Sequence, residues 1–116
     1  MTSLVYQKQG LTTAITANTT AVTGNITVAN SGGGACVVKV DNISNANTDI
    51  FLNWSTANTV VATIANATST GNSVCIQHGT TQFIRVQGSQ TPGAKVYFSA
   101  IAAAPAVIYI TPVSIG

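Results

Sequence analysis

The chain has 116 residues, which predicts a single domain with one hydrophobic core. Hydrophobic residues make up 46% of the sequence and charged residues only 5%, against about 25% charged residues in ordinary globular chains. Four basic and two acidic residues give a net charge of +2, which excludes the clustered positive charge that nucleic-acid binding needs. A surface so poor in charge repels other proteins weakly, so we expect partners or further copies of the chain to cover much of it.

The N-terminal segment, residues 1–10, lacks the long apolar core of a signal peptide. The longest apolar run, Ala100 to Ile110, is broken by Pro105 and is shorter than the roughly 20 residues of a transmembrane helix. We therefore expect a protein made in the cytoplasm and without a membrane partner. Residues 1–10, including Tyr6, are expected to form an edge strand or an arm that adds a strand to a neighbour.

The next stretch, Leu11 to Asn30, is rich in threonine and shows no helical apolar stripe. Threonine favours strands because its Cβ is branched. The pattern predicts two short strands near Thr12–Ala17 and Ile26–Ala29, with a turn at Gly24-Asn25. Ser31 to Gly34 predicts a flexible break before the centre of the chain.

The stretch from Cys36 to Trp54 holds the sole tryptophan and both acids, and it predicts a central hairpin with a polar loop. Apolar and polar residues alternate in it with a period of two, which is typical of half-buried strands. The residues expected to face the core are Cys36, Val38, Val40, Ile50, Leu52 and Trp54. Trp54 is expected to be the largest side chain of that core.

The C-terminal half predicts five more strands and a short tail at residues 112–116. These strands are expected at Thr59–Ala65, Ser73–Gln77, Gln82–Gln87, Ala94–Ala102 and Val107–Thr111. Ile84 and Val86 should point inward. About eight short strands, spaced by roughly 8–12 residues with polar turns between them, predict an all-β fold. We expect one antiparallel β-sandwich over residues 11–116, either a jelly roll or immunoglobulin-like.

Groups able to carry out chemistry are scarce, because the chain has one histidine, two aspartates, two cysteines and no glutamate. A hydrolase built around His78 is formally possible, but no motif supports it. Asp41 and Asp49 could approach as paired carboxylates, or bind calcium with the loop asparagines. The simpler interpretation is that both aspartates satisfy turn backbones. We expect a non-enzymatic protein without catalytic residues, cofactor or metal.

The two cysteines, Cys36 and Cys75, are flanked by valine, alanine or isoleucine. We expect buried, reduced thiols that act as small hydrophobic side chains, with a disulfide across the sheets as the alternative. Cys75 and His78 have the spacing of a local metal pair, but a fourth zinc ligand is lacking.

Outward-facing aromatic residues on a surface poor in charge indicate a contact surface, unless a second sheet covers them. Together with the Asn-rich loop and the N-terminal segment they define the candidate interface. It comprises Tyr6, Asn42, Asn45, Asn47, Asp49, Phe51, Phe83 and Tyr97. An alternative is a carbohydrate-binding module that uses Trp54 as a stacking platform.

The order of these segments resembles small structural proteins of tailed bacteriophage virions. It begins with Val-Lys-Val-Asp-Asn-Ile-Ser-Asn-Ala-Asn-Thr-Asp-Ile-Phe-Leu-Asn-Trp at residues 38–54. An Ile-x-x-Gly-Thr turn follows at residues 76–80, then Val-Tyr-Phe-Ser-Ala-Ile-Ala-Ala at 96–103 and Val-Ile-Tyr-Ile-Thr-Pro-Val at 107–113. The resemblance covers most of the chain after residue 35, and its motifs are loose.

The resemblance implies a capsid decoration, or cement, protein that stabilises the phage head by bridging capsid subunits. Such proteins are commonly β-sandwiches or jelly rolls that sit as trimers on the capsid surface. The expected partners are therefore the major capsid protein and copies of the chain itself in a homotrimer, assembled into the virion in the host cytoplasm. A tail, adaptor or fibre component is the alternative within the same class.

Overall fold

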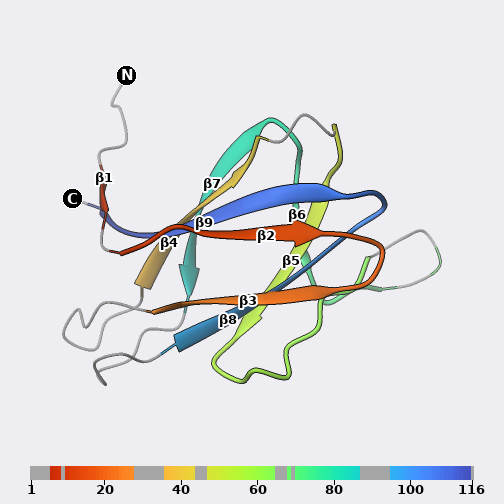
Figure 1. The fold of residues 1–116 in the computed structure, drawn as a ribbon, viewed down its shortest axis with the longest axis horizontal. Helices are drawn as coiled ribbons and strands as arrows, with labels where there is room; N and C mark the ends of the chain where they lie inside the picture. Colours follow the sequence, from red (N-terminus) through yellow and green to blue (C-terminus); the bar gives the residue numbers. More distant parts are fainter. Residues whose placement is uncertain are drawn as a thin grey trace.

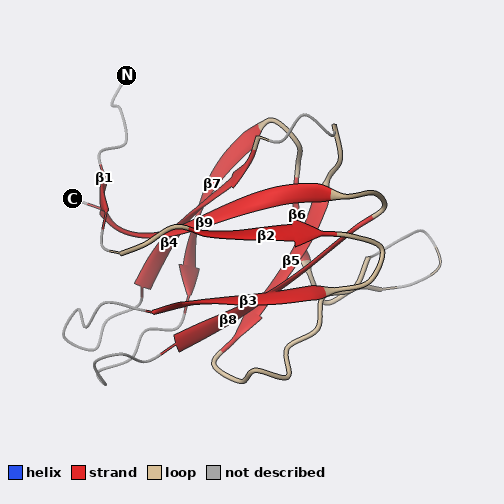
Figure 2. Ribbon diagram, viewed as in Figure 1, coloured by secondary structure: helices blue, strands red, loops and turns tan. Residues whose placement is uncertain are grey.

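The computed structural model describes residues 6–8, 10–27, 36–43, 47–64, 68, 70–86 and 95–115. These residues form strands, turns and loops and no helix (Figure 2), so none of them belongs to a helix able to cross a membrane. The strands are β1 (Tyr6–Lys8), β2 (Thr13–Ala17), β3 (Val22–Thr27), β4 (Cys36–Asn42), β5 (Ile50–Ser55), β6 (Val74–Ile76), β7 (Thr80–Val86), β8 (Lys95–Ala102) and β9 (Ala106–Ile115).

The strands form two antiparallel sheets that pack face to face (Figure 1). Sheet A has the order β1-β9-β4-β7, with β2 on the same edge of β9 as β1, and sheet B has the order β3-β8-β5-β6. Strand β2 pairs with β9, β3 with β8, β4 with β7 and β5 with β6. This nested pairing is that of a jelly roll, so the predicted β-sandwich is confirmed and its jelly-roll form is the one that the strand order supports.

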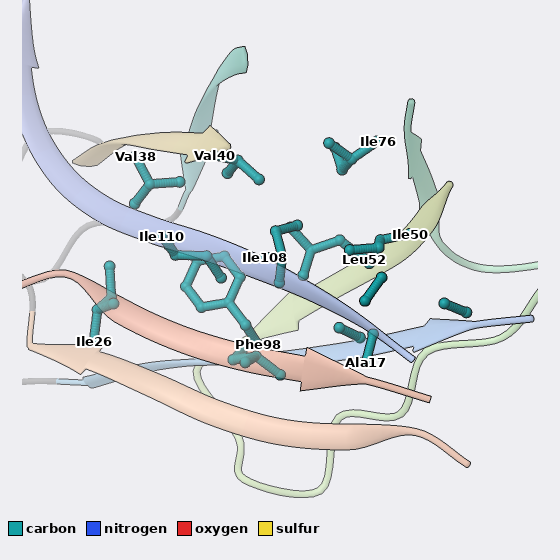
Figure 3. Close-up of a cluster of buried hydrophobic side chains, with 14 of the residues drawn as sticks. Ala17, Ile26, Val38, Val40, Ile50, Leu52, Ile76, Phe98, Ile108 and Ile110 are labelled. Carbon is teal, nitrogen blue, oxygen red and sulfur yellow. The ribbon is translucent and has the colours of Figure 1, made fainter. Parts of the chain in front are cut away.

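One hydrophobic core lies between the sheets (Figure 3). The predicted inward faces of β4 and β5 are confirmed, since Val38, Val40, Ile50 and Leu52 are fully buried. The side chain of Cys36 lies outside the described residues. The largest fully buried side chain is Phe98 of β8, which meets Ile108 and Ile110 of β9 in the core.

Trp54 takes a smaller part in the core than its size predicts. It is only partly buried, and its ring centre lies 6.4 Å from that of Phe98. Strand β6 pairs with residues 50–52 of β5 and stops short of Trp54. The core is therefore built around Phe98, with Trp54 at its margin.

The predicted central hairpin is wrong, because β4 and β5 belong to different sheets. Strand β4 pairs with β7 and β9, whereas β5 pairs with β6 and β8. Both arrangements give the same alternation of apolar residues, since a strand in either sheet turns one face to the same core. Periodicity alone therefore could not separate a hairpin from a crossing between sheets.

The predicted turn at Gly24-Asn25 is also wrong, because both residues lie inside β3. Gly24 pairs with Phe98 of β8 and faces Ile15 of β2. A Cβ atom at position 24 would lie 2.9 Å from Cγ1 of Ile15, closer than carbon atoms approach. The glycine serves close packing of two strands and not a turn.

The predicted strand at Thr59–Ala65 is absent, for residues 60–64 are described and are not in a strand. They run across the outer face of sheet B, where the Ala62 N–H donates to Ser99 Oγ at 2.9 Å. Both edges of β5 are already paired with β6 and β8. The backbone of this segment therefore bonds to polar side chains and not to a strand.

Strand β9 extends beyond its predicted end and includes Pro112. Its first part, residues 106–110, pairs with β2, and residues 113–115 pair with β1. Pro112 lies between these two paired stretches, where no described strand residue pairs with that edge of β9. A proline has no N–H to donate, so this position tolerates it within a long strand.

Candidate interaction surface

The predicted interface residues do not gather on one surface. Phe51 and Tyr97 lie on the outer face of sheet B, whereas Phe83 lies on the outer face of sheet A. The side chain of Tyr6 and the whole of Asn45 lie outside the described residues. The backbone of Tyr6 belongs to β1 and pairs with Ile115 of the same chain.

The expectation of a contact role for Asn42 needs correction, because its side chain is fully buried. Its Nδ2 donates to the carbonyls of Thr48 at 3.0 Å and Ile76 at 2.8 Å. Its backbone carbonyl accepts from the Gly79 N–H at 2.6 Å. Asn42 thus joins the end of β4 to the β4–β5 loop, to β6 and to the β6–β7 turn, and it cannot contact a partner in the folded chain.

The exposed part of the same end contains Asn47, Asp49 and His78. Oδ1 of Asp49 accepts from the His78 N–H at 3.0 Å and lies 3.4 Å from Nδ1 of the same residue. The backbone bond, and then the ring of His78, hold the pKa of Asp49 below its usual range. Asp41 pairs instead with Lys39, so the two aspartates have separate partners and not the shared site that their spacing allowed.

The outer face of sheet B is covered in part by the chain's own β5–β6 connection. Ser99 is fully buried and Ala62 nearly so, although both lie outside the core. Nδ2 of Asn53 donates to the Val61 carbonyl at 3.2 Å, a second polar link to the covering segment. Phe51 and Tyr97 are half-buried on this face, which reduces what either can offer to a partner.

No segment like residues 60–64 crosses the outer face of sheet A among the described residues, although Val113, which the register places on this face opposite Val37, is only 4% exposed. The strand register sets Asp41 between Tyr109 and Thr81, and sets Lys39 beside Phe83 in the next row. We call this surface the A face. It comprises Ala14, Thr16, Val37, Lys39, Asp41, Thr81, Phe83, Arg85, Val107, Tyr109 and Thr111.

The A face concentrates charge in a chain that has little. Nζ of Lys39 lies 3.4 Å from Oδ2 of Asp41, and Thr81 Oγ1 donates to Oδ1 of the same carboxylate. Arg85 is exposed and makes no ion pair with a described residue. Aromatic rings lie among these charges, with Tyr109 exposed by 38%. Such a mixture of aromatic and charged groups is typical of protein contact surfaces.

Sequence reasoning missed Tyr109 and Arg85 as surface candidates. The signal was present, because Tyr109 alternates with the buried Ile108 and Ile110 in a clear strand pattern. Arg85 alternates in the same way with Ile84 and Val86. What the pattern could not supply was the pairing of β4 with both β7 and β9, which brings the two residues onto one face.

Cys75 was expected to be buried, but it is exposed on the outward side of β6 and forms no disulfide. Partial burial, with a smaller effect of the Asp49 charge, raises the pKa of its thiol. It is therefore a weak nucleophile at neutral pH. The described residues contain no group of three histidine, cysteine or acidic side chains placed to hold a metal ion.

Comparison of the chain with protein families, with curated proteins and with solved structures finds no match.

Proposed function

We propose that this chain is a non-enzymatic structural protein of a tailed-phage virion, and specifically a capsid decoration protein that bridges capsid subunits. The A face supports this proposal most directly. It is a broad sheet surface with aromatic and charged side chains, in a chain with four basic and two acidic residues. The jelly roll is common among viral capsid domains and also among lectins, so the fold agrees with the proposal without choosing it.

The work of such a protein is mechanical. The A face would lie against the capsid, and separation of the subunits would have to re-expose the surface that it buries. Each contact of one small domain is weak. Many copies on one shell, each touching more than one subunit, multiply the effective affinity.

A carbohydrate-binding role has less support. The ring of Trp54 is turned toward the core and packs near Phe98, so it offers no open platform for a sugar. A tail, adaptor or fibre role uses the same kind of surface and differs in its place on the particle.

The test uses phage particles assembled with and without this chain, and measures the temperature at which they release DNA. We expect particles that carry the chain to release DNA at a higher temperature, and adding purified chain to the bare particles should restore the difference. Electron microscopy of labelled chain should place it on the head. Placement on the tail would favour the alternative, and particles without the chain in either place would contradict the proposal.

A matched pair of variants tests the A face itself. Tyr109→Lys places a charge beside Asp41 on the A face, at a position that is 38% exposed. Thr23→Lys makes the same change at an exposed site of β3 in sheet B. We expect Tyr109→Lys to lose binding to particles and Thr23→Lys to keep it. Equal binding of both variants would exclude the A face as the contact surface.

A further inference from the structure

The sheet edges of this molecule differ in how they are protected from pairing with another chain. Edge strands are usually blocked by shortness, charge or proline, and glycine weakens a strand. In sheet B, β6 has three residues and β3 contains Gly24. In sheet A, the edge formed by β1 and β2 is divided into two short strands. Strand β7, the other edge of sheet A, has seven residues without glycine or proline, and Arg85 is its one charged residue.

The inward side of β7 is incompletely covered. Its partner strand across the sandwich, β6, is less than half as long, with three residues against seven. Gln82 and Ile84 point inward but are only half-buried, and Ile84 packs against the margin of the core. A strand added beside β7 would extend the sheet and shield the apolar side chain of Ile84 from water.

We propose that two copies of this chain associate through their β7 strands, paired antiparallel across a two-fold axis at Phe83. Two identical antiparallel strands are related by such an axis, and the contact closes on itself. The two β7 strands pair over all seven residues only when Phe83 lies opposite its own copy. Ile84 then lies opposite Gln82 of the other copy, so both inward positions gain cover.

The same register brings Arg85 of one copy toward Asp41 of the other. Arg85 of one copy falls opposite Thr81 of the other, and Asp41 is the neighbour of Thr81 in its own sheet. The backbones of Arg85 and that Asp41 are then two strand spacings apart, roughly 10 Å. The extended arginine side chain spans most of this distance on the A face. The chain's exposed arginine thus reaches the sole acid of that face, twice per pair.

This inference deepens the proposed function by stating how copies meet, and it differs from the trimer that the phage resemblance implies. It rests on the described edge of β7 and holds in solution without a capsid. Loss of capsid binding with an intact dimer would contradict only the virion role. A monomer that still binds capsids would contradict only the β7 contact.

The first experiment measures the mass of the purified chain by light scattering and native mass spectrometry over a range of concentrations. We expect a concentration-dependent dimer. The variant Phe83→Glu faces Lys39 within its own chain but faces a like charge across the axis. It should remain monomeric at every concentration, and circular dichroism should show that it is folded.

Two further variants test whether loss of the dimer is specific to changes at the β7 edge. Thr16→Glu adds the same charge to an outward, exposed position of β2 at the opposite edge, and should leave the dimer intact. Arg85→Ala removes an exposed side chain, and should weaken the dimer by roughly tenfold through two lost ion pairs. A trimer, a monomeric wild type, or a dimer that survives Phe83→Glu would overturn the proposal.

The register is tested by a short thiol cross-linker applied to Phe83→Cys. The two introduced thiols should lie opposite each other and give a covalent dimer in high yield. The unmodified chain measures the background from Cys36 and Cys75, and Thr16→Cys measures chance collision. A yield for Phe83→Cys no higher than these two would exclude the Phe83 axis.

Discussion

On each side of this jelly roll, an edge strand of sheet A lies next to an edge strand of sheet B. The two sides are built differently. On the closed side, β2 and β3 run side by side (Figure 1), and Thr13 Oγ1 donates to the Asn25 carbonyl at 2.9 Å. The Ala102 N–H also donates to the Asn18 carbonyl there, at 2.9 Å. On the open side, the short β6 faces the longer β7, and the inward side chains of Gln82 and Ile84 stay half-buried. One side of the sandwich is therefore linked by hydrogen bonds within the chain, and the other is the side where we propose that a second copy binds.

The largest expected effect comes from truncating one isoleucine on each side. Ile15 of β2 is 3% exposed, whereas Ile84 of β7 is half-buried. Ile15→Ala should lower the free energy of unfolding by about 2–5 kcal/mol, and Ile84→Ala by roughly half as much. Denaturant unfolding at concentrations where the chain is monomeric measures both. Equal losses would show that the open side is as well packed as the closed one.

The next largest loss of stability is expected at Asn42, which is hydrogen-bonded from β4 to β6 on the open side. Asn42→Ala leaves the buried carbonyl of Ile76 without its donor, and should destabilise the fold by about 1–3 kcal/mol. Asn53→Ala removes a similar bond, to the Val61 carbonyl, in an exposed setting. We expect it to cost clearly less in the same unfolding experiment. If the two variants were equally stable, the Asn42 bonds would not be what holds this end together.

A smaller loss is expected from Gly24→Ala on the closed side. The added methyl group would lie 2.9 Å from Cγ1 of Ile15, so β2 and β3 would have to separate slightly. Overpacking of this kind costs about 1–3 kcal/mol, reduced here because alanine suits a strand better than glycine. Thermal unfolding against Thr23→Ala, an outward neighbour, measures the effect. An unchanged Gly24→Ala midpoint would mean that the closed side has room to spare.

The smallest effect is a pH dependence on the open side, where Asp49 and His78 join the β4–β5 loop to the β6–β7 turn. The pKa of Asp49 is lower in the folded chain than in the unfolded chain. Its contribution to stability is therefore present above the unfolded pKa and lost as the pH falls through the folded one. We expect wild type to be slightly more stable than Asp49→Asn at pH 7, and the difference to vanish in strong acid. A difference that persists in strong acid would point to a cause other than ionisation.

The alternation of apolar residues was enough to predict a sandwich and much of its core. Val38, Val40, Ile50, Leu52 and Val86 were placed on the buried face from sequence, and all five are buried. Alternation works here because each strand turns one face to a single core. The same signal failed for residues 60–64, which alternate like a strand but cross the outer face of sheet B.

The candidate surface was less predictable than the core. Phe83 was expected to face outward and does, on the A face. Asn42 was expected at a contact and is buried, because a polar loop residue can equally satisfy backbone groups inside the fold. Tyr109 and Arg85 were overlooked because they share one face only through the pairing of strands that are far apart in sequence.

By itself, the sequence determined an all-β chain that is poor in charge, with strands of known inward faces. These properties are local, since the Cβ direction alternates along any strand regardless of its neighbours. Only the tertiary structure decided which strands pair, that β4 and β5 lie in different sheets, and that Gly24 serves packing. Pairing depends on contacts between distant segments, and strands with similar patterns are interchangeable until the whole sandwich closes. The open edge of β7 is likewise a feature of the tertiary structure, because it depends on β6 being shorter than the β7 strand that it faces.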